Sequence, residues 1–215
     1  MCLFCEKIVC NTHIISYKYS YCLSNNKDFC QFLTTKMTTK SKSEIRTAAK
    51  QAVKSLLPEQ RISKSALIVK EILSLEAVKS ARVIALYASL PDEVISGEAI
   101  DTLATQKRVV LPRVAGDDMD FYPYDPTAME IGSFGISEPQ TEVAIDPSKI
   151  DVIIVPGVAF TLSGMRCGRG KGYYDKYLSR NGFRAIKIGV CYKEQLAEDI
   201  PSEPHDILMD CVICY

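Results

Sequence analysis

The chain has 215 residues, of which 47% are hydrophobic and 24% charged, as expected of a globular protein large enough to bury a core. Its 26 basic and 26 acidic residues cancel, so no overall field favours nucleic acid or an anionic membrane. No apolar run approaches the roughly 20 residues that a membrane-spanning helix needs. Any anion site must therefore come from a local cluster of basic residues.

Residues 1–36 differ in composition from the rest and hold most of the cysteines. Cys2 and Cys5 lack a second pair at zinc-site spacing, and charged and polar residues interrupt the apolar stretch 8–15, unlike a signal peptide. We predict a disordered, cysteine-rich extension over 1–36 and one domain over 37–215. The remaining cysteines show no disulfide framework, which fits a reducing cytosol.

Two amphipathic helices open the domain. Ser41 and Glu44 form a capping-box pattern, so the first helix should begin near Lys42. Lys42 and Arg46 share one face of its first turns, where cations oppose the helix dipole, and either solvation or a bound anion explains them. The second helix should span 58–75. Apolar residues spaced 3.6 apart predict the buried faces: Ile45, Ala48, Ala49, Ala52, Val53 and Leu56 in the first helix, and Ile62, Leu67, Ile68, Ile72 and Leu75 in the second.

The rest of the domain alternates strands with helices. Glu93 follows the first strand, where ligands gather in open α/β sheets, and it either accepts hydrogen bonds from a ligand or begins a helix. The pattern predicts an α/β fold with three layers, an open and mostly parallel sheet flanked by helices. Strands are expected at 82–89, 107–114, 119–124 (an edge), 152–155 (buried on both faces), 185–192 and 211–215, with helices at 98–105 and 193–197.

A glycine-rich basic loop follows the strand 152–155 and precedes a helical pattern that starts at Tyr173. Glycines permit close backbone approach, N–H groups at a helix start point at an anion, and cations neutralise it. The loop is not a Walker A motif, because Met165 and Gly172 occupy the positions of its first glycine and its Ser/Thr. Nor is it a dinucleotide fingerprint, because Tyr173 replaces the third glycine. A solvated helix-capping turn is the alternative, but three cations alternating with glycine favour an anion site.

The stretch PGVAFTLSGMRCGRGKGYYDKYL resembles the signature of the 5-formyltetrahydrofolate cyclo-ligase family, Pro-Gly-x-x-Phe-Asp followed by Gly-x-Arg-x-Gly-x-Gly-Lys-Gly-Tyr-Tyr-Asp. Residues 164–175 match without a gap, whereas Thr161 replaces the usual aspartate. Residues 132–139 resemble the family's Gly-x-Trp-Gly-Ile-x-Glu-Pro element. There Phe134 replaces tryptophan, which keeps a flat ring but loses the indole N–H. The resemblance covers about residues 40–212 and implies a sheet related to the sugar-phosphate isomerase and CoA-transferase folds.

The resemblance implies a ligase of one-carbon folate metabolism. It would use ATP to close 5-formyltetrahydrofolate to 5,10-methenyltetrahydrofolate through an N5-iminium phosphate, releasing ADP and phosphate. The implied ATP-binding residues are Lys42, Arg46, Arg166, Cys167, Gly168, Arg169, Gly170, Lys171, Gly172, Tyr173 and Tyr174. The implied folate-binding residues are Ala88, Glu93, Phe134, Arg169, Gly170, Lys171, Gly172 and Tyr173. Arg169, Lys171 and Tyr173 are expected to be catalytic, and Asp175 and Asp206 to bind Mg²⁺.

Other assignments complete this hypothesis. His205 and Asp210 are read as structural, and no cysteine is expected to act as a nucleophile. We expect a cytoplasmic monomer, with a mitochondrial destination left open, that takes ATP and possibly polyglutamated 5-formyltetrahydrofolate and binds neither nucleic acid nor membrane. The rival hypotheses are a phosphosugar- or acyl-CoA-binding enzyme of the same sheet class and a non-catalytic nucleotide- or folate-binding module.

Overall fold

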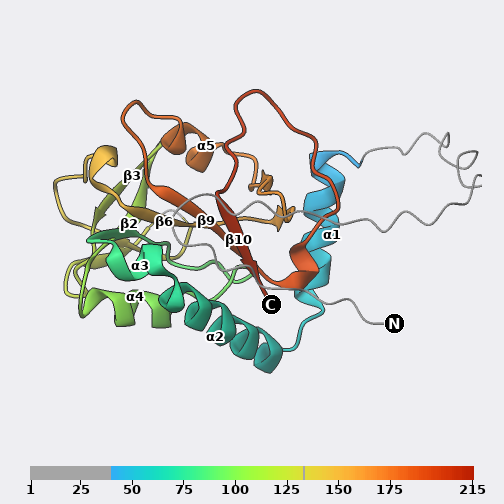
Figure 1. Cartoon of the computed structure of the whole chain (residues 1–215), viewed down its shortest axis with the longest axis horizontal. Helices are drawn as coiled ribbons and strands as arrows, with labels where there is room; N and C mark the ends of the chain where they lie inside the picture. Colours follow the sequence, from blue (N-terminus) through green and yellow to red (C-terminus); the bar gives the residue numbers. More distant parts are fainter. Residues whose placement is uncertain (1–39, 133) are drawn as a thin grey trace, which may run out of the picture. The chain divides into compact units, whose positions relative to one another are not determined.

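The computed structural model describes residues 40–132 and 134–215, so the predicted extension 1–36 lies outside the described residues. A six-stranded sheet with the order β10-β9-β6-β1-β2-β3 runs through the domain (Figure 1). Neighbouring strands are parallel except β2 and β3, which are antiparallel, so the predicted edge strand is confirmed. The strands are β1 (Val83–Ala85), β2 (Arg108–Ala115), β3 (Asp118–Pro123), β6 (Val152–Pro156), β9 (Ile186–Cys191) and β10 (Cys211–Cys214).

Helices cover both faces of this sheet, which confirms the three-layer α/β class. In Figure 1, α2, α3 and α4 lie on one side of the sheet and α5 lies on the other. The helices are α1 (Lys42–Lys54), α2 (Pro58–Ser74), α3 (Glu76–Ser80), α4 (Gly97–Ala104) and α5 (Tyr173–Leu178), with short 3₁₀ turns at η2 (Pro147–Lys149) and η3 (Lys193–Gln195).

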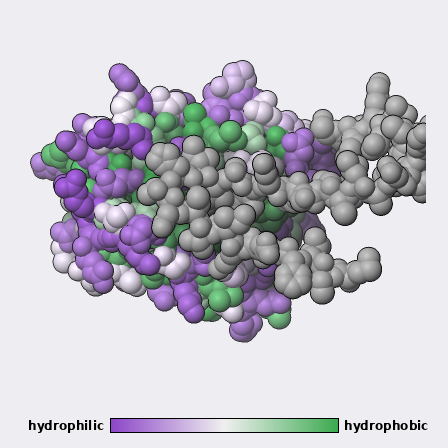
Figure 2. Space-filling model, viewed as in Figure 1, coloured by the Kyte–Doolittle hydropathy of each residue, from purple (hydrophilic) through white to green (hydrophobic). Residues whose placement is uncertain are grey.

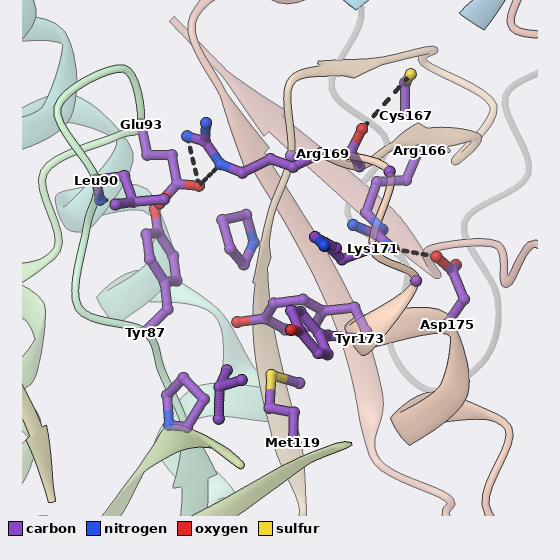
Figure 3. Close-up of a pocket in the computed structure, with 18 of the residues that line it drawn as sticks. Tyr87, Leu90, Glu93, Met119, Arg166, Cys167, Arg169, Lys171, Tyr173 and Asp175 are labelled. Carbon is purple, nitrogen blue, oxygen red and sulfur yellow. Dashed lines mark hydrogen bonds and ion pairs between the residues drawn. The ribbon is translucent and has the colours of Figure 1, made fainter. Parts of the chain in front are cut away.

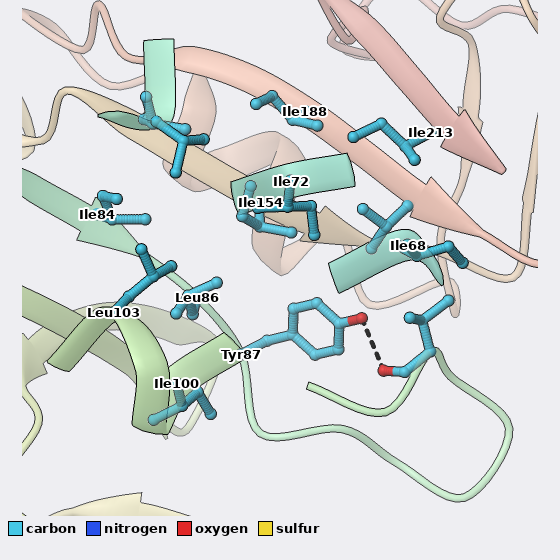
Figure 4. Close-up of a cluster of buried hydrophobic side chains, with 14 of the residues drawn as sticks. Ile68, Ile72, Ile84, Leu86, Tyr87, Ile100, Leu103, Ile154, Ile188 and Ile213 are labelled. Carbon is cyan, nitrogen blue, oxygen red and sulfur yellow. Dashed lines mark hydrogen bonds between the residues drawn. The ribbon is translucent and has the colours of Figure 1, made fainter. Parts of the chain in front are cut away.

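The core follows from the two-residue period of the strands. Ile84, Ile154 and Ile188 point to the side of α2 and α4, where they pack with residues such as Ile68 and Ile72 (Figure 4). The residues between them point the other way, toward α5, where they pack with Tyr177 and Leu178. Since both faces are covered, every residue of β6 is buried, as the unbroken β-branched run 152–155 predicted.

Two small hairpins stand beside the main sheet and were not expected from the sequence. One pairs β4 (Met129–Ile131) with β5 (Ser137–Pro139), and the other pairs β7 (Ala159–Phe160) with β8 (Arg166–Cys167). Their strands have only two or three residues, too few to show a period. Both hairpins contribute to the functional site described below.

The helix starts were predicted well, but parts of their buried faces were not. The capping box of Ser41 and Glu44 is present and α1 begins at Lys42. Ala48, however, is exposed. In α2, Ile62 and Leu67 are 60% and 44% exposed, so their predicted burial is wrong. The contact face of α2 is centred on Ile68 and Ile72, one side of the apolar stripe, because α2 packs on the sheet with that narrower face.

One strand boundary and one additional helix also differ from expectation. The strand predicted over 82–89 ends at Ala85, and the chain continues as a loop toward the site. The short helix α3, which was not predicted, fills the turn between α2 and β1.

Hydrophilic residues surround the periphery of the face shown in Figure 2, with hydrophobic residues in patches between them. Within the part of the chain that the structure describes, no helix has both the length and the apolar character needed to span a bilayer.

Candidate functional site

A pocket opens where the chain leaves the carboxyl ends of the parallel strands β1, β2 and β6 (Figure 3). The first turns of α1, the loop after β1, the glycine-rich loop and residues 203–206 meet there. Every residue predicted for the site lines this pocket: Lys42, Arg46, Ala88, Glu93, Phe134, Arg166, Cys167, Gly168, Arg169, Gly170, Lys171, Gly172, Tyr173, Tyr174, Asp175 and Asp206. Sequence reasoning missed other residues that line it, among them Tyr87, Met119, Glu138 and Glu203.

The glycine-rich loop is shaped by backbone conformations that need glycine. Gly170 and Gly172 have φ values of 102° and 71°, in the left-handed region, and α5 starts directly after Gly172. A Cβ on Gly168 would lie 2.8 Å from Arg166 Nη1, so any side chain at this position would displace the Arg166 guanidinium group. The strand 152–155 does not lead straight into the loop, as the sequence suggested, because the β7–β8 hairpin intervenes.

The departure at Thr161 is accommodated in the turn of that hairpin. Thr161 is buried, and its Oγ1 accepts a hydrogen bond from the Met165 N–H at 3.1 Å and lies 2.8 Å from Ser163 Oγ. Threonine thus supplies a side-chain oxygen to the turn N–H, as an aspartate can.

Three of the predicted phosphate-binding cations are paired with carboxylates of the same pocket. Arg166 donates to Asp175 at 2.6 Å, and Arg169 reaches across the pocket to Glu93 (Figure 3). Arg169 also pairs with Asp92. Lys42 Nζ lies 2.7 Å from Asp206 and 3.1 Å from Glu203. The charges of these three cations are therefore compensated within the pocket itself.

Lys171 and the Nε atom of Arg166 have no hydrogen-bond partner among the described residues. Lys171 is exposed on the loop and has no hydrogen-bond or ion-pair partner among the described residues. The Arg166 side chain is 4% exposed, and its Nε is buried without a hydrogen-bond partner within residues 40–132 and 134–215. Because a buried donor left unpaired costs free energy, this N–H favours an incoming acceptor. Arg46 Nε donates to the Gly168 carbonyl at 2.7 Å and so holds the loop against α1.

Glu93 lies on a loop whose backbone is held by hydrogen bonds from two buried tyrosine hydroxyls. The Tyr192 hydroxyl donates to the Glu93 carbonyl at 3.1 Å, and the Tyr87 hydroxyl donates to the Val94 carbonyl at 2.9 Å. The Glu93 carboxylate accepts from the Leu90 N–H at 3.0 Å and from Arg169. Burial raises the pKa of Glu93 above its usual value, although these two donors oppose the rise. Its carboxylate is an acceptor directed into the pocket and held in a fixed position.

Asp175 and Asp206 present carboxylate oxygens to the cationic end of the pocket, where they pair with Arg166 and Lys42. Burial would raise the pKa of Asp206, but the hydrogen bond and charge of Lys42 lower it instead. Glu203, His205 and Asp206 have potential ligand atoms within 4.8 Å of one another. His205 lines the pocket, is exposed and lies 3.2 Å from Glu203. Asp210 pairs with Lys187 at 2.8 Å, and neither of these two residues lines the pocket.

The opposite end of the pocket is apolar and aromatic. The rings of Phe134 and Tyr173 meet edge to face with 6.4 Å between their centroids, and Met119 lies beside them. The Tyr173 hydroxyl donates to the Gly116 carbonyl at 3.0 Å. Burial raises the pKa of the Cys167 thiol, although the charges of Arg46, Lys42 and Arg166 oppose the rise.

A mostly parallel sheet with a basic, glycine-rich loop at the carboxyl ends of its strands defines an α/β protein whose pocket is suited to an anionic ligand beside an apolar one. The sequence pattern of the 5-formyltetrahydrofolate cyclo-ligase family matches residues 38–215, and the chain belongs to this family. The family predicted from the sequence is thereby confirmed.

Individual relatives agree with this assignment. The chain is 34% identical to the 5-formyltetrahydrofolate cyclo-ligase of Mycolicibacterium smegmatis, over 82% of this chain and 95% of that protein. It is 30% identical to the Saccharomyces cerevisiae protein of the same name, over 81% of this chain and 95% of that one. The solved structure of Aquifex aeolicus 5,10-methenyltetrahydrofolate synthetase matches with a TM-score of 0.73 at 34% identity, covering 80% and 89% of the two chains. These names agree with the predicted ligase of folate metabolism and favour neither rival class.

Proposed function

We propose that this chain uses ATP to cyclise 5-formyltetrahydrofolate to 5,10-methenyltetrahydrofolate. The observation that carries the proposal is the joining, in one pocket, of a basic glycine-rich loop with an acceptor, Glu93, and an aromatic wall. The loop suits a triphosphate. The carboxylate suits the amino and ring N–H groups of a pterin, and the wall suits its flat rings.

The reaction needs activation of a poor electrophile. The N5-formyl group is amide-like, so N10 does not attack it readily. Transfer of the γ-phosphoryl group to the formyl oxygen gives an iminium phosphate and ADP; N10 then attacks the formyl carbon, and phosphate leaves as the ring closes. Phosphoryl transfer asks the protein mainly for positioning and charge neutralisation. Lys171, Arg169 and Arg166 supply the charge, and Tyr173 packs where the two substrates meet.

Bound phosphate would exchange with the acids that hold these cations. Arg169 cannot keep both its Glu93 pair and a close contact with a phosphoryl group unless its side chain moves. When phosphate draws Arg169 away, an oxygen of Glu93 is freed for the pterin. Lys42 and Arg166 would likewise exchange Asp206 and Asp175 for phosphate oxygens.

Asp175 and Asp206 are the residues that would hold Mg²⁺, because carboxylate oxygens are the ligands it prefers and both line the pocket beside the cations. When bound, the ion would neutralise charge on the transferring phosphoryl group. Each carboxylate holds a cation in the absence of ligand, so the ion and the phosphates would enter together.

One assay tests the proposal against its rivals. Full-length protein, Mg-ATP and 5-formyltetrahydrofolate are mixed in mildly acidic buffer, and the methenyl chromophore is followed by absorbance, with ATP omitted as the control. ATP-dependent product supports the cyclo-ligase. Saturable binding of folate or nucleotide without product would indicate the binding module, and ATP-independent turnover of a sugar phosphate would indicate the other enzyme class.

We further propose that residues 37–215 form the catalytic domain of a cytoplasmic monomer that also accepts polyglutamated folate. The family pattern begins at residue 38, which supports the boundary. A relative from Arabidopsis thaliana is named as mitochondrial, so cell fractionation is needed alongside light scattering and mass spectrometry of the native N-terminus. KM values for mono- and polyglutamated substrate test the last point.

A further inference from the structure

Glu138 is a buried carboxylate at the pocket that the proposed chemistry does not use. It lies on β5, is 5% exposed and lines the pocket on the same side as Phe134. Directly opposite it on β4, Glu130 is exposed and does not line the pocket. Two glutamates on one hairpin thus occupy contrasting environments. Because a buried carboxylate is costly unless it is paired, Glu138 needs a compensating role.

The contacts of Glu138 join the β4–β5 hairpin to the main sheet. Burial raises its pKa, while a hydrogen bond from the backbone N–H of Val114 and the charge of Arg113 oppose the rise. Both residues belong to β2. Arg113 in turn donates to the carbonyls of Pro139 and Thr141 at 3.0 and 3.1 Å. Each element therefore holds the backbone of the other with a charged side chain.

The turn that joins β4 to β5 carries Phe134. The Gly132 N–H donates to the Ile136 carbonyl at 2.8 Å, which closes the turn. A Cβ on Gly132 would overlap the Glu138 carboxyl group, so glycine is needed for the carboxylate to lie beneath the turn. The position of Phe134 against Tyr173 thus depends on the contacts that hold the β4–β5 hairpin to β2.

We propose that Glu138 is a positioning residue for the aromatic wall of the pocket: its carboxylate ties the β4–β5 hairpin to β2 and so fixes Phe134 at the folate subsite. The kinetic part of this inference rests on the proposed function. The structural part does not, because it concerns only where the Phe134 turn lies in the free protein.

The ligand-free test uses fluorescence. The chain has no tryptophan, so Phe134→Trp introduces a single indole at the turn. In that background, Glu138→Ala should shift the emission to longer wavelength and lower its anisotropy. Glu138→Gln, which keeps an acceptor oxygen for the Val114 N–H, should stay close to the parent, and Glu130→Ala should match it. If emission and anisotropy of Glu138→Ala equal those of the parent, the positioning role is refuted, whatever the substrate.

A second variant guards against a Glu138→Ala protein that does not fold. Gly132→Ala keeps the carboxylate but displaces it, and it should produce the same spectral change. The double variant should be no worse than Glu138→Ala alone, since both act on one contact. Fully additive changes would overturn the shared mechanism.

The kinetic test follows the separate substrates in the protein without the indole. Glu138→Ala should raise the KM for 5-formyltetrahydrofolate about threefold to tenfold, the range expected when an aromatic contact is lost. The KM for ATP and kcat should change by less than about twofold, and Glu138→Gln should restore most of the loss. Equal rises in both KM values together with a lower urea midpoint would show a general structural role instead. A wild-type protein without turnover would defeat the proposed function, while the fluorescence result would still decide the role of Glu138.

Discussion

The pair of Arg166 and Asp175 should contribute more to stability than any exposed charge of the glycine-rich loop. We consider Arg166→Met, which keeps an apolar stem but removes the charge. The two side chains are 4% and 15% exposed and 2.6 Å apart, so the substitution leaves Asp175 charged and poorly solvated. Removing one partner of a buried pair costs about 3–5 kcal/mol. Asp175 is still partly exposed to solvent and accepts a weak hydrogen bond from the Ile207 N–H at 3.4 Å, which favours the lower end of this range. We expect about 3 kcal/mol, a large share of a typical stability of about 5–15 kcal/mol.

Urea denaturation followed by circular dichroism measures this loss. Adding Asp175→Asn to Arg166→Met should recover at least about half of it, because the second change removes the stranded charge. Lys171→Ala is the matched control from the same loop, and it should stay within about 0.5 kcal/mol of the wild type since it loses no described contact. A loss below about 1 kcal/mol for Arg166→Met, or no recovery in the double variant, would refute the view that this pair stabilises the site.

The remaining predictions concern activity and pH. Lys171→Ala should lower kcat/KM by about a hundredfold or more with an unchanged urea midpoint, and near-normal turnover would remove its phosphate role. Phe134→Ala should raise the KM for folate about threefold to tenfold and leave that for ATP unchanged; equal effects would mean that Phe134 only packs. Burial raises the pKa of Glu93 above its ordinary 4.5, so its ionisation destabilises the fold as pH rises through the folded-state pKa. Glu93→Gln should therefore gain stability relative to wild type as pH rises from 4.5 to that folded-state pKa, by about 1.4 kcal/mol for each pH unit crossed, while folate binding is lost. Thermal unfolding at several pH values checks the trend, and a gain confined to pH values below 4.5 would contradict it.

The loop and the first helix could be predicted because their determinants are close together in the sequence. The capping box of Ser41 and Glu44 lies within four residues, and residues 164–175 contain the glycines, the cations and the helix start in one stretch. Likewise, the unbroken β-branched run of β6 is typical of a strand that is buried on both faces. In these segments local chemistry and tertiary environment agree.

The partners of the cations could not be predicted in the same way. Asp92 precedes Arg169 by 77 positions, and only the packing of the loop after β1 against the glycine-rich loop brings them together. Glu203 meets Lys42 for a comparable reason. The role of Glu138 was also hidden, because its burial depends on a three-residue strand and on a glycine that leaves space for it. Pairwise electrostatics between distant segments has no periodic signal in a sequence.

The same carboxylates link the stability of the site to its function. Cations gathered around one pocket repel each other, and without ligand the acids offset that repulsion at short range. A triphosphate can replace them because it brings more negative charge and several acceptor oxygens to the same cations. Lys171 lacks an acidic partner within the described residues, so it meets phosphate without first giving up a contact. Its loss should therefore act on turnover alone, whereas the loss of Arg166 should act on both turnover and stability. Comparing Arg166→Met with Lys171→Ala thus separates a cation that stabilises the folded site from one that serves only the reaction.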